Sequence, residues 1–339
     1  MFDIFKIVFT DPKFLSAFSQ TIIIIAIGFF FMRKGIVTSS AKSVLTALIW
    51  KLAVPCFAFN AFMQDFEWLS FKSSFTEFVL AVFFYIVLIF IGKFLLIKKG
   101  KDFSTVGGFM MAIGQTTLFS MPILQSVYEG SAKEVVLYIS TISIVFRIFV
   151  YIIGYTVISG EKITLKKLLP QIKKVFLTPV MIGMFLGILV FVLQNRLPVL
   201  RIDKSLPVLY TTVTALSRMV GPLCMLLIGM SVGEARIAEC IKDGFAWLLA
   251  VLRNIVAPVV VLLLCILMHK AGIYTFTEYS MIAIVVGFSA PISVTLSIAC
   301  MEYQKEEVMA SRACVISTLL TLLTFPMSFV IVHFALRFL

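Results

Sequence analysis

Few residues of this chain are charged. Asp, Glu, Lys and Arg together make up 14% of its 339 residues, whereas soluble domains carry about 25%. Hydrophobic residues make up 61%, phenylalanine alone occurs 34 times, and the mean hydropathy is +1.08. This scarcity of charge excludes a soluble domain, so we expect an integral membrane protein surrounded by the lipid bilayer.

Histidines and metal-ligand spacings are also scarce. The chain has two histidines, His269 and His333, and its six cysteines show no C-x-x-C spacing. These absences argue against a zinc site and a disulfide framework, so we expect no metal and no cofactor. No H-E-x-x-H and no paired mid-span aspartates occur, which argues against an intramembrane enzyme.

Acidic residues are outnumbered, with 17 Asp and Glu against 29 Lys and Arg, a formal net charge of +12. The basic residues are scattered through short loops between apolar runs. This distribution is typical of topology control in a membrane, so we expect no nucleic acid partner.

Apolar runs of about 20 residues, the length of a membrane-spanning helix, recur throughout the chain. We therefore predict an all-α integral membrane protein with ten transmembrane helices and no soluble domain. The predicted spans are 15–32, 43–64, 75–97, 104–125, 135–158, 175–193, 206–229, 244–268, 279–300 and 312–337.

Loop charges predict the orientation of these spans. The loops after odd-numbered spans hold 15 Lys and Arg, and the opposite side, with both termini, holds nine. Because basic loops stay in the cytoplasm, both termini are predicted to be extracytoplasmic, in the cytoplasmic membrane.

Short motifs repeat about half a chain apart, at offsets of 167 to 169 residues. Because five spans are an odd number, a second copy of five must be inverted across the membrane. We predict a first repeat over 1–158, a basic cytoplasmic linker over 159–174 and an inverted repeat over 175–339. The matching pairs are 46–48 with 214–216, 51–55 with 218–222, and Pro122 with Pro291.

Two apolar runs are interrupted by a proline among small and polar residues, at 114–122 and 287–293. Such breaks free backbone groups that lipid cannot satisfy, and matched breaks are the sequence pointer to a transporter's binding site. A single hydroxyl there can instead bond to its own helix. The candidate substrate-binding residues at the breaks are Gln115, Thr116, Thr117, Ser120, Pro122, Ser289, Pro291 and Ser293.

Four cations lie near mid-span, at Lys51, Arg147, Arg218 and Arg253, and no mid-span carboxylate is evident. Each costs roughly 2.5–3.5 kcal/mol in a membrane helix, so something must offset the charge. An anionic cargo is one answer, and carbonyls at the broken helices or carboxylates at span ends are the other. Asn60 contacts either the ligand or a neighbouring helix. The lack of mid-span acids disfavours a proton relay, whereas sodium coupling stays open.

Several stretches together resemble the auxin efflux carrier family in its compact bacterial form. They are 28–35 (GFFFMRKG), 52–55 with Phe59-Asn60, 114–122, 222–231 (PLCMLLIGMS), Ala290-Pro291 with Ala299, and 317–326 (STLLTLLTFP). The likeness covers nearly the whole chain.

The resemblance implies two inverted five-helix repeats, as in the bile acid:sodium symporter-like fold, with helices 4 and 9 crossing at their prolines. It also implies elevator-type alternating access and a homodimer. Bacterial relatives are typically assigned organic acids such as malate or malonate. Gln115 replaces an asparagine that the family associates with the substrate carboxylate, and Thr117 and Ser120 replace glycines, so the pocket differs from the family's.

We therefore predict a secondary transporter of a small organic anion, a mono- or dicarboxylate, across the cytoplasmic membrane. A non-translocating sensor on the same fold, a sodium-coupled organic anion symporter and an anion channel are the alternatives.

Overall fold

The computed structural model describes residues 12–337 apart from 64, 66–67, 129–132, 161–172 and 174–175. Of residues 68–71 and 133 it describes only the backbone. The chain ends and most of the predicted basic linker over 159–174 therefore lie outside the described residues.

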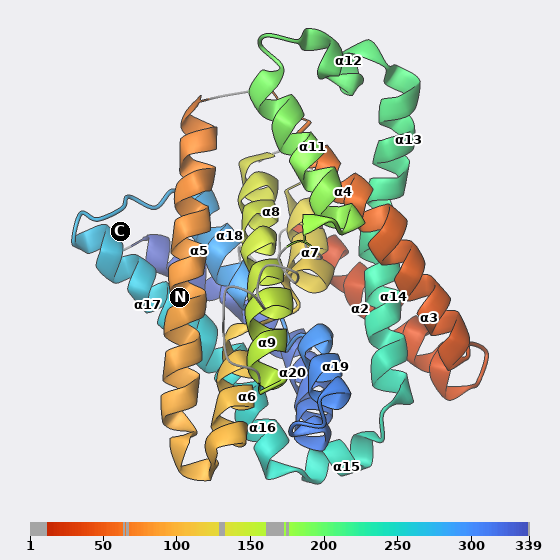
Figure 1. Cartoon of the computed structure of the whole chain (residues 1–339), viewed down its shortest axis with the longest axis vertical. Helices are drawn as coiled ribbons and strands as arrows, with labels where there is room; N and C mark the ends of the chain where they lie inside the picture. Colours follow the sequence, from red (N-terminus) through yellow and green to blue (C-terminus); the bar gives the residue numbers. More distant parts are fainter. Residues whose placement is uncertain are drawn as a thin grey trace.

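The described chain is built from helices (Figure 1). They are α2 (Pro12–Arg33), α3 (Ser39–Leu48), α4 (Val54–Asn60), α5 (Trp68–Leu95), α6 (Lys101–Ala112), α7 (Met121–Val127), α8 (Lys133–Arg147), α9 (Tyr155–Ile158), α11 (Pro179–Leu193), α12 (Ile202–Ser205), α13 (Pro207–Arg218), α14 (Val220–Glu234), α15 (Ile237–Lys242), α16 (Gly244–Val251), α17 (Ala257–Lys270), α18 (Glu278–Phe288), α19 (Val294–Glu302) and α20 (Glu307–Leu336).

Wider helical turns interrupt four of the apolar runs. The π-helical turns η1 (Ile49–Ala53), η3 (Thr116–Ser120), η4 (Ile148–Gly154) and η6 (Leu252–Val256) join α3 to α4, precede α7, and join α8 to α9 and α16 to α17. Two 3₁₀ turns, η2 (Ile97–Lys99) and η5 (Pro198–Leu200), lie in connections. π turns are frequent at functional sites, and three of the four predicted mid-span cations lie in or beside one: Lys51, Arg147 and Arg253.

Seven continuous helical segments in the described chain are long and apolar enough to cross a membrane. They match seven of the ten predicted spans. Predicted span 6 appears as a shorter apolar helix, Pro179–Leu193, and span 9 as Glu278–Phe288 followed by α19. Span 4 is divided between α6 and α7. The multi-pass helical character is therefore confirmed, while the count of ten crossings stays a prediction.

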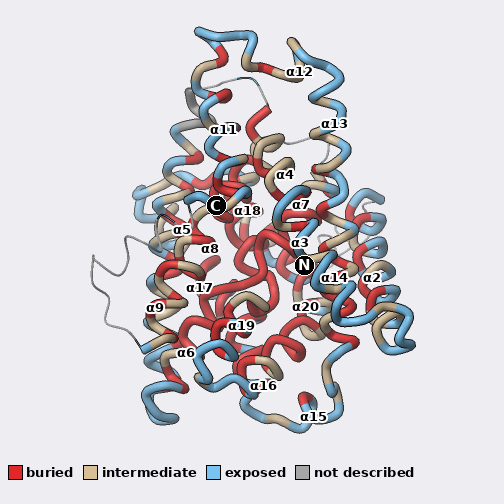
Figure 2. The backbone as a smooth tube through the Cα atoms, turned by 45° about the vertical axis from the view of Figure 1, so that its right-hand side comes forward, coloured by how far each residue is buried: buried red, intermediate tan, exposed pale blue. Residues whose placement is uncertain are grey.

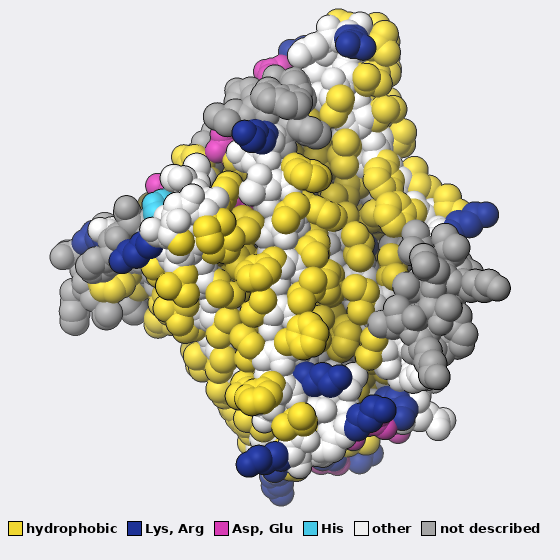
Figure 3. Space-filling view, turned by 60° about the vertical axis from the view of Figure 1, so that its left-hand side comes forward, with side chains coloured by type: hydrophobic (Ala, Val, Ile, Leu, Met, Phe, Trp, Pro, Cys, Tyr) yellow, Lys and Arg dark blue, Asp and Glu magenta, His cyan; other side chains and the backbone are white. Residues whose placement is uncertain are grey.

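The outer surface suits lipid. Large apolar side chains are exposed on several helices, including Phe94 at 75% and Leu323 at 72%. Figure 3 shows hydrophobic side chains over the middle of one face, with many of the basic residues near its ends. Helices satisfy their backbone groups internally, which a bilayer requires.

One group of helices is held together by close backbone contact. Gly229 of α14 lies against α2, where an added Cβ would be 2.0 Å from the carbonyl oxygen of Ile25. Gly28 of α2 makes the reciprocal approach, 2.3 Å from the carbonyl oxygen of Leu226. Small residues bring membrane helices together in this way. Helix α4 packs against α11 and α13 in the same group.

An ion-pair cluster closes this group at one end. The buried Arg201 donates from Nε to Asp203 Oδ1 at 2.7 Å and from Nη1 to Asp65 Oδ1 at 3.0 Å. Lys204 also contacts Asp65. The hydrogen bond from Arg201 holds the pKa of Asp203 below its ordinary value. The cluster links the segment after α4 to the turn before α13.

The other group contains α5, α6, α8, α16, α18 and α20, which pack on one another. Figure 2 shows that the buried backbone is concentrated in the middle of the molecule, and α8, α18 and α20 are rich in buried residues. The two interrupted helices, α6 with α7 and α18 with α19, meet within this buried core.

The two breaks pair with each other directly. Gly114 and Ile292 form an antiparallel backbone bridge. The Gln115 N–H donates to the Pro291 carbonyl at 2.7 Å, and the Ser293 N–H donates to the Ile113 carbonyl at 3.2 Å. Backbone groups freed by each interruption are therefore satisfied by the other. We call this paired region, residues 113–115 and 289–293, the crossing.

The position of the first break differs from the prediction. Helix α6 ends at Ala112 and the chain is extended at Ile113, whereas Pro122 is the second residue of α7. The π-helical turn η3 runs directly into α7, so Pro122 follows a wider turn and not a free helix start. Proline has no N–H to donate, and such a local widening of the helix accommodates it. Pro291, in contrast, lies in the break itself. The bridge joins Gly114 and Ile292, so Pro291 lies within the crossing and Pro122 lies outside it.

Candidate functional site

A cavity of about 540 Å³ lies on one side of the crossing. Its walls come from α3, η1, α14, α19, α20 and the crossing, so both groups of helices contribute to it. We call it the central cavity. Its lining residues are Lys42, Thr46, Trp50, Gln115, Leu118, Leu227, Ile228, Ser231, Val232, Glu234, Ala235, Pro291, Ile292, Val294, Thr295, Ser297, Ile298, Met301, Ser311, Cys314, Val315 and Thr318.

The lining is mostly apolar, and its two charged members neutralise each other. Lys42 pairs with Glu234, which also accepts from the Ser39 hydroxyl at 2.7 Å. Both lie at helix ends, away from the crossing. The pair ties α3 to the end of α14 and leaves no net charge on the lining.

Gln115 and Pro291 are the predicted break residues that line the cavity. The Gln115 side-chain oxygen accepts from the Val294 N–H at 3.2 Å and so caps the first turn of α19. Val294, Thr295 and Leu118 are neighbouring lining residues. The starts of α19 and of η3 therefore both meet the cavity, and helix starts carry partial positive charge.

The predicted hydroxyls mostly bind backbone. Thr116 donates to the Gly287 carbonyl at 3.2 Å and Ser120 to the Val286 carbonyl at 3.0 Å, so both tie η3 to the last turn of α18. Ser289 donates to Val285 of its own helix at 2.8 Å. Thr117 and Ser293 have buried hydroxyls without a hydrogen-bond partner among the described residues. None of these five residues lines the central cavity.

Arg253 is fully buried and holds the crossing from η6. Its Nε donates to the Ala290 carbonyl at 2.8 Å, and its Nη1 donates to the Met111 and Ala112 carbonyls at 3.0 and 2.7 Å. Its Nη2 has no hydrogen-bond partner in the described chain. The carbonyl alternative from the sequence therefore holds for Arg253, which contacts both broken helices and does not line the cavity.

A neighbouring amide, Asn254, supports the same region and was missed by sequence reasoning. It donates to the Ser317 carbonyl at 2.8 Å and accepts from the Ser317 hydroxyl at 2.6 Å. That hydroxyl in turn accepts from the Ile292 N–H at 2.9 Å. The sequence signal that could have identified Asn254 is its position directly after the mid-span Arg253.

Arg147 is 3% exposed and has a different environment. Its guanidinium lies over the Trp50 ring, 5.1 Å from the centroid, and Trp50 lines the central cavity. Within the described residues Arg147 forms no ion pair and its Nε has no hydrogen-bond partner. A cation–π contact offsets only part of the cost of burying a charge. Among the described residues, Arg147 is therefore a buried cation without an anionic partner.

Lys51, Arg218 and Asn60 lie away from the cavity. Lys51 and Arg218 are exposed on the surface, and neither lines the cavity. Lys51 and Arg218 occupy matching positions in the predicted repeats, but the structure does not place them at the crossing. Asn60, at the end of α4, has a buried side-chain oxygen without a hydrogen-bond partner in the described chain.

A buried carboxylate is present after all. Glu77, which the sequence placed at a span end, is completely buried on α5. It pairs with none of the four cations; the side chains of Ser280 and Tyr274 are its polar neighbours. Its burial depends on α18 and the loop before it, so a window of apolar residues along α5 could not indicate it.

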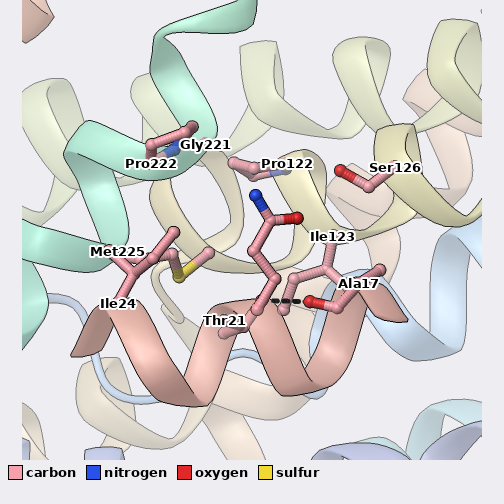
Figure 4. A pocket seen from close by; sticks show the side chains of 10 residues that line it. Ala17, Thr21, Ile24, Pro122, Ile123, Ser126, Gly221, Pro222 and Met225 are labelled. Carbon is pink, nitrogen blue, oxygen red and sulfur yellow. Dashed lines mark hydrogen bonds between the residues drawn. The ribbon is translucent and has the colours of Figure 1, made fainter. Parts of the chain in front are cut away.

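A second, smaller pocket of about 30 Å³ lies where α7 meets α2 and α14. Figure 4 shows Pro122 and Ile123 of α7 facing Gly221 and Pro222 of α14, with Thr21 of α2 below. This volume holds about one or two waters. The smaller pocket and the central cavity follow successive stretches of α14, at 221–225 and 227–234.

The spacing G-x-S-x-G occurs once along α14, at 229–233. It lies inside a helix, whereas hydrolase serines lie at a strand-to-helix turn. Ser231 donates to the Leu227 carbonyl of its own helix at 2.8 Å. This serine is therefore a helix residue on the cavity wall.

Comparison with known families adds a finding to this geometry. Residues 14–329 match the family of membrane transport proteins, which includes the auxin efflux carriers. The chain belongs to this family. The resemblance drawn from the sequence motifs is thereby confirmed, and this member of the family is a multi-pass membrane transporter. A search of curated proteins found no match to the transporter.

Proposed function

We propose that this transporter carries a small organic anion, a mono- or dicarboxylate, across the cytoplasmic membrane by elevator-type alternating access. The negative charge proposed for the cargo rests on Arg147. This buried guanidinium has no anionic partner among the described residues and contacts Trp50, which lines the central cavity.

The charge of Arg147 acts on the cavity through Trp50. At a separation of roughly 8 Å and an effective dielectric constant of about 20, a unit anion gains about 2 kcal/mol from such a cation. The Lys42–Glu234 pair contributes no opposing net charge. An anion in the cavity would therefore supply the counter-charge that Arg147 lacks among the described residues.

The crossing offers the groups that would orient a carboxylate. The starts of η3 and α19 meet at the cavity beside Gln115 and Thr295. Free N–H groups at helix starts bind carboxylates, as broken helices do in other transporters. The Gln115 amide nitrogen donates no hydrogen bond to the described residues, so it is available to a ligand.

The difference between the two pockets supports alternating access. The central cavity, at about 540 Å³, lies next to the end of α14, which the loop charges assign to the cytoplasmic side. On the other side, α7 packs against α14 and leaves about 30 Å³. We propose that this conformation faces the cytoplasm and that α7 and the crossing slide along α14 to open the opposite side.

The test is counterflow of labelled mono- and dicarboxylates in proteoliposomes, with Arg147→Met and Arg147→Lys as paired variants. Methionine keeps much of the volume and removes the charge, so we expect a loss of affinity of about 10-fold or more, since about 2 kcal/mol is lost. Lysine should keep part of the affinity. Equal anion affinity in wild type and Arg147→Met would refute the assignment, and saturable binding without counterflow would favour a sensor.

A further inference from the structure

Three backbone carbonyls converge on one point inside the crossing. Met111 and Ala112 end α6, and Ala290 follows the end of α18. The last carbonyls of a helix carry partial negative charge, and carbonyls of this kind coordinate sodium in transporters with broken helices. By its chemistry alone, this cluster is a site for a small cation.

The guanidinium of Arg253 already occupies that site. It donates to all three carbonyls at 2.7 to 3.0 Å, from Nε on one side and Nη1 on the other. It forms no ion pair with a carboxylate of the described residues, and the phenol of Tyr85 is a polar neighbour. The carbonyls are therefore the counter-charge of this cation.

Gly114 makes the arrangement possible. An added Cβ there would lie 1.9 Å from Nη2 and 2.5 Å from Cζ of Arg253. The guanidinium is thus in direct contact with the backbone of the crossing. Arg253 does not line the central cavity, so a cargo bound in the cavity would not contact it.

We propose that Arg253 is a resident cation, which replaces a bound sodium ion at the crossing and makes this transporter independent of sodium there. A covalently attached charge stays with the carbonyl cluster in every conformation, whereas a free ion would have to bind and leave in each cycle. The consequence for transport rests on the proposed function; the consequence for ion binding does not.

The test is cation-dependent thermal unfolding of purified protein at matched ionic strength, with sodium, guanidinium or the bulky N-methylglucamine cation as chloride. The Tm of the wild type should be the same in sodium and N-methylglucamine. The Tm of Arg253→Ala should be lower and should rise saturably with sodium or guanidinium, by about 3–5 °C at ten times the dissociation constant. The proposal would be overturned if sodium raised the Tm of the wild type, or if none of the three cations changed the Tm of Arg253→Ala.

A second pair of variants applies if Arg253→Ala does not fold. Arg253→Lys keeps the charge and should be recovered folded and insensitive to sodium, whereas Arg253→Met keeps volume only and should gain sodium sensitivity. Equal loss of both would show that packing, not charge, matters, and would contradict the proposal. Arg147→Met is the matched control, because Arg147 donates no hydrogen bond to a carbonyl of the described residues and its loss should create no sodium response. These readouts need no substrate, so a failure of anion transport would leave them unaffected.

Discussion

Gly114 lies directly beneath the guanidinium of Arg253, and we expect an alanine at this position to displace it. The backbone of Gly114 does not have the positive φ that favours glycine, so alanine itself fits the local conformation. The conflict comes from the side chain: the new Cβ would lie 1.9, 2.5 and 2.8 Å from Nη2, Cζ and Nε. Real Cβ contacts are not shorter than 3.0 Å, so the guanidinium must move by about 1 Å.

That movement has a definite cost. The bonds from Arg253 to Ala290, Met111 and Ala112 are already 2.7 to 3.0 Å long, so a shift of about 1 Å breaks at least one of them. A hydrogen bond to a charged group contributes about 1.5–3 kcal/mol. We expect Gly114→Ala to lower the free energy of unfolding by about 2–4 kcal/mol, measured by denaturant titration in mixed micelles.

A double-mutant cycle separates this contact from a general effect of alanine. In an Arg253→Ala background the obstacle is gone, so adding Gly114→Ala should cost less than about 0.5 kcal/mol. Gly244→Ala is the control, because an added Cβ at Gly244 meets nothing within 4 Å. If Gly114→Ala costs the same with and without Arg253, the steric reasoning is wrong.

Three further predictions concern the supports around the site. Asn254→Ala should cost about 2–3 kcal/mol in denaturant unfolding, because it removes the two hydrogen bonds that join the amide to Ser317 inside the core; a neutral result would mean that water replaces the amide. Gly229→Ala should separate α2 from α14 and cost about 1–3 kcal/mol, and an unchanged midpoint in the same titration would contradict that contact. Because the pKa of Asp203 is held below its ordinary 3.8 by Arg201, its stabilisation is present above that pH and is lost as pH falls through the lower folded-state value. Asp203→Asn should therefore flatten the acid side of a Tm-against-pH profile, and an unchanged profile would show that the ion pair contributes nothing.

The sequence pointed to two breaks, and the structure shows where they lie and which residues meet there. Gln115 and Pro291 were named from composition around the breaks, and both line the central cavity. The break in the first helix was assigned to Pro122, but it lies at Ile113–Gln115, because the π turn η3 accommodates the proline without ending the helix. A proline in an apolar run therefore does not by itself fix where the helix breaks.

The four mid-span cations show why a charge count does not assign roles. Along the chain, Lys51, Arg147, Arg218 and Arg253 look alike, since each interrupts an apolar run. In the structure two are exposed, one is bound to carbonyls and one is buried against Trp50. The direction of a side chain depends on the helix packed against it, and a single apolar run contains no information about that neighbour.

The sequence by itself determined that this protein lies in a lipid bilayer, that it is helical and which family it belongs to. Lipid cannot satisfy free backbone groups, so long apolar runs with little charge must become helices that cross or lie within the membrane. The tertiary structure decided which helix breaks pair with each other and which cation binds the carbonyls at the crossing. Those pairings join Gly114 with Ile292 and Arg253 with three carbonyls. They depend on contacts between distant segments, and only the packing of the helices brings these segments together.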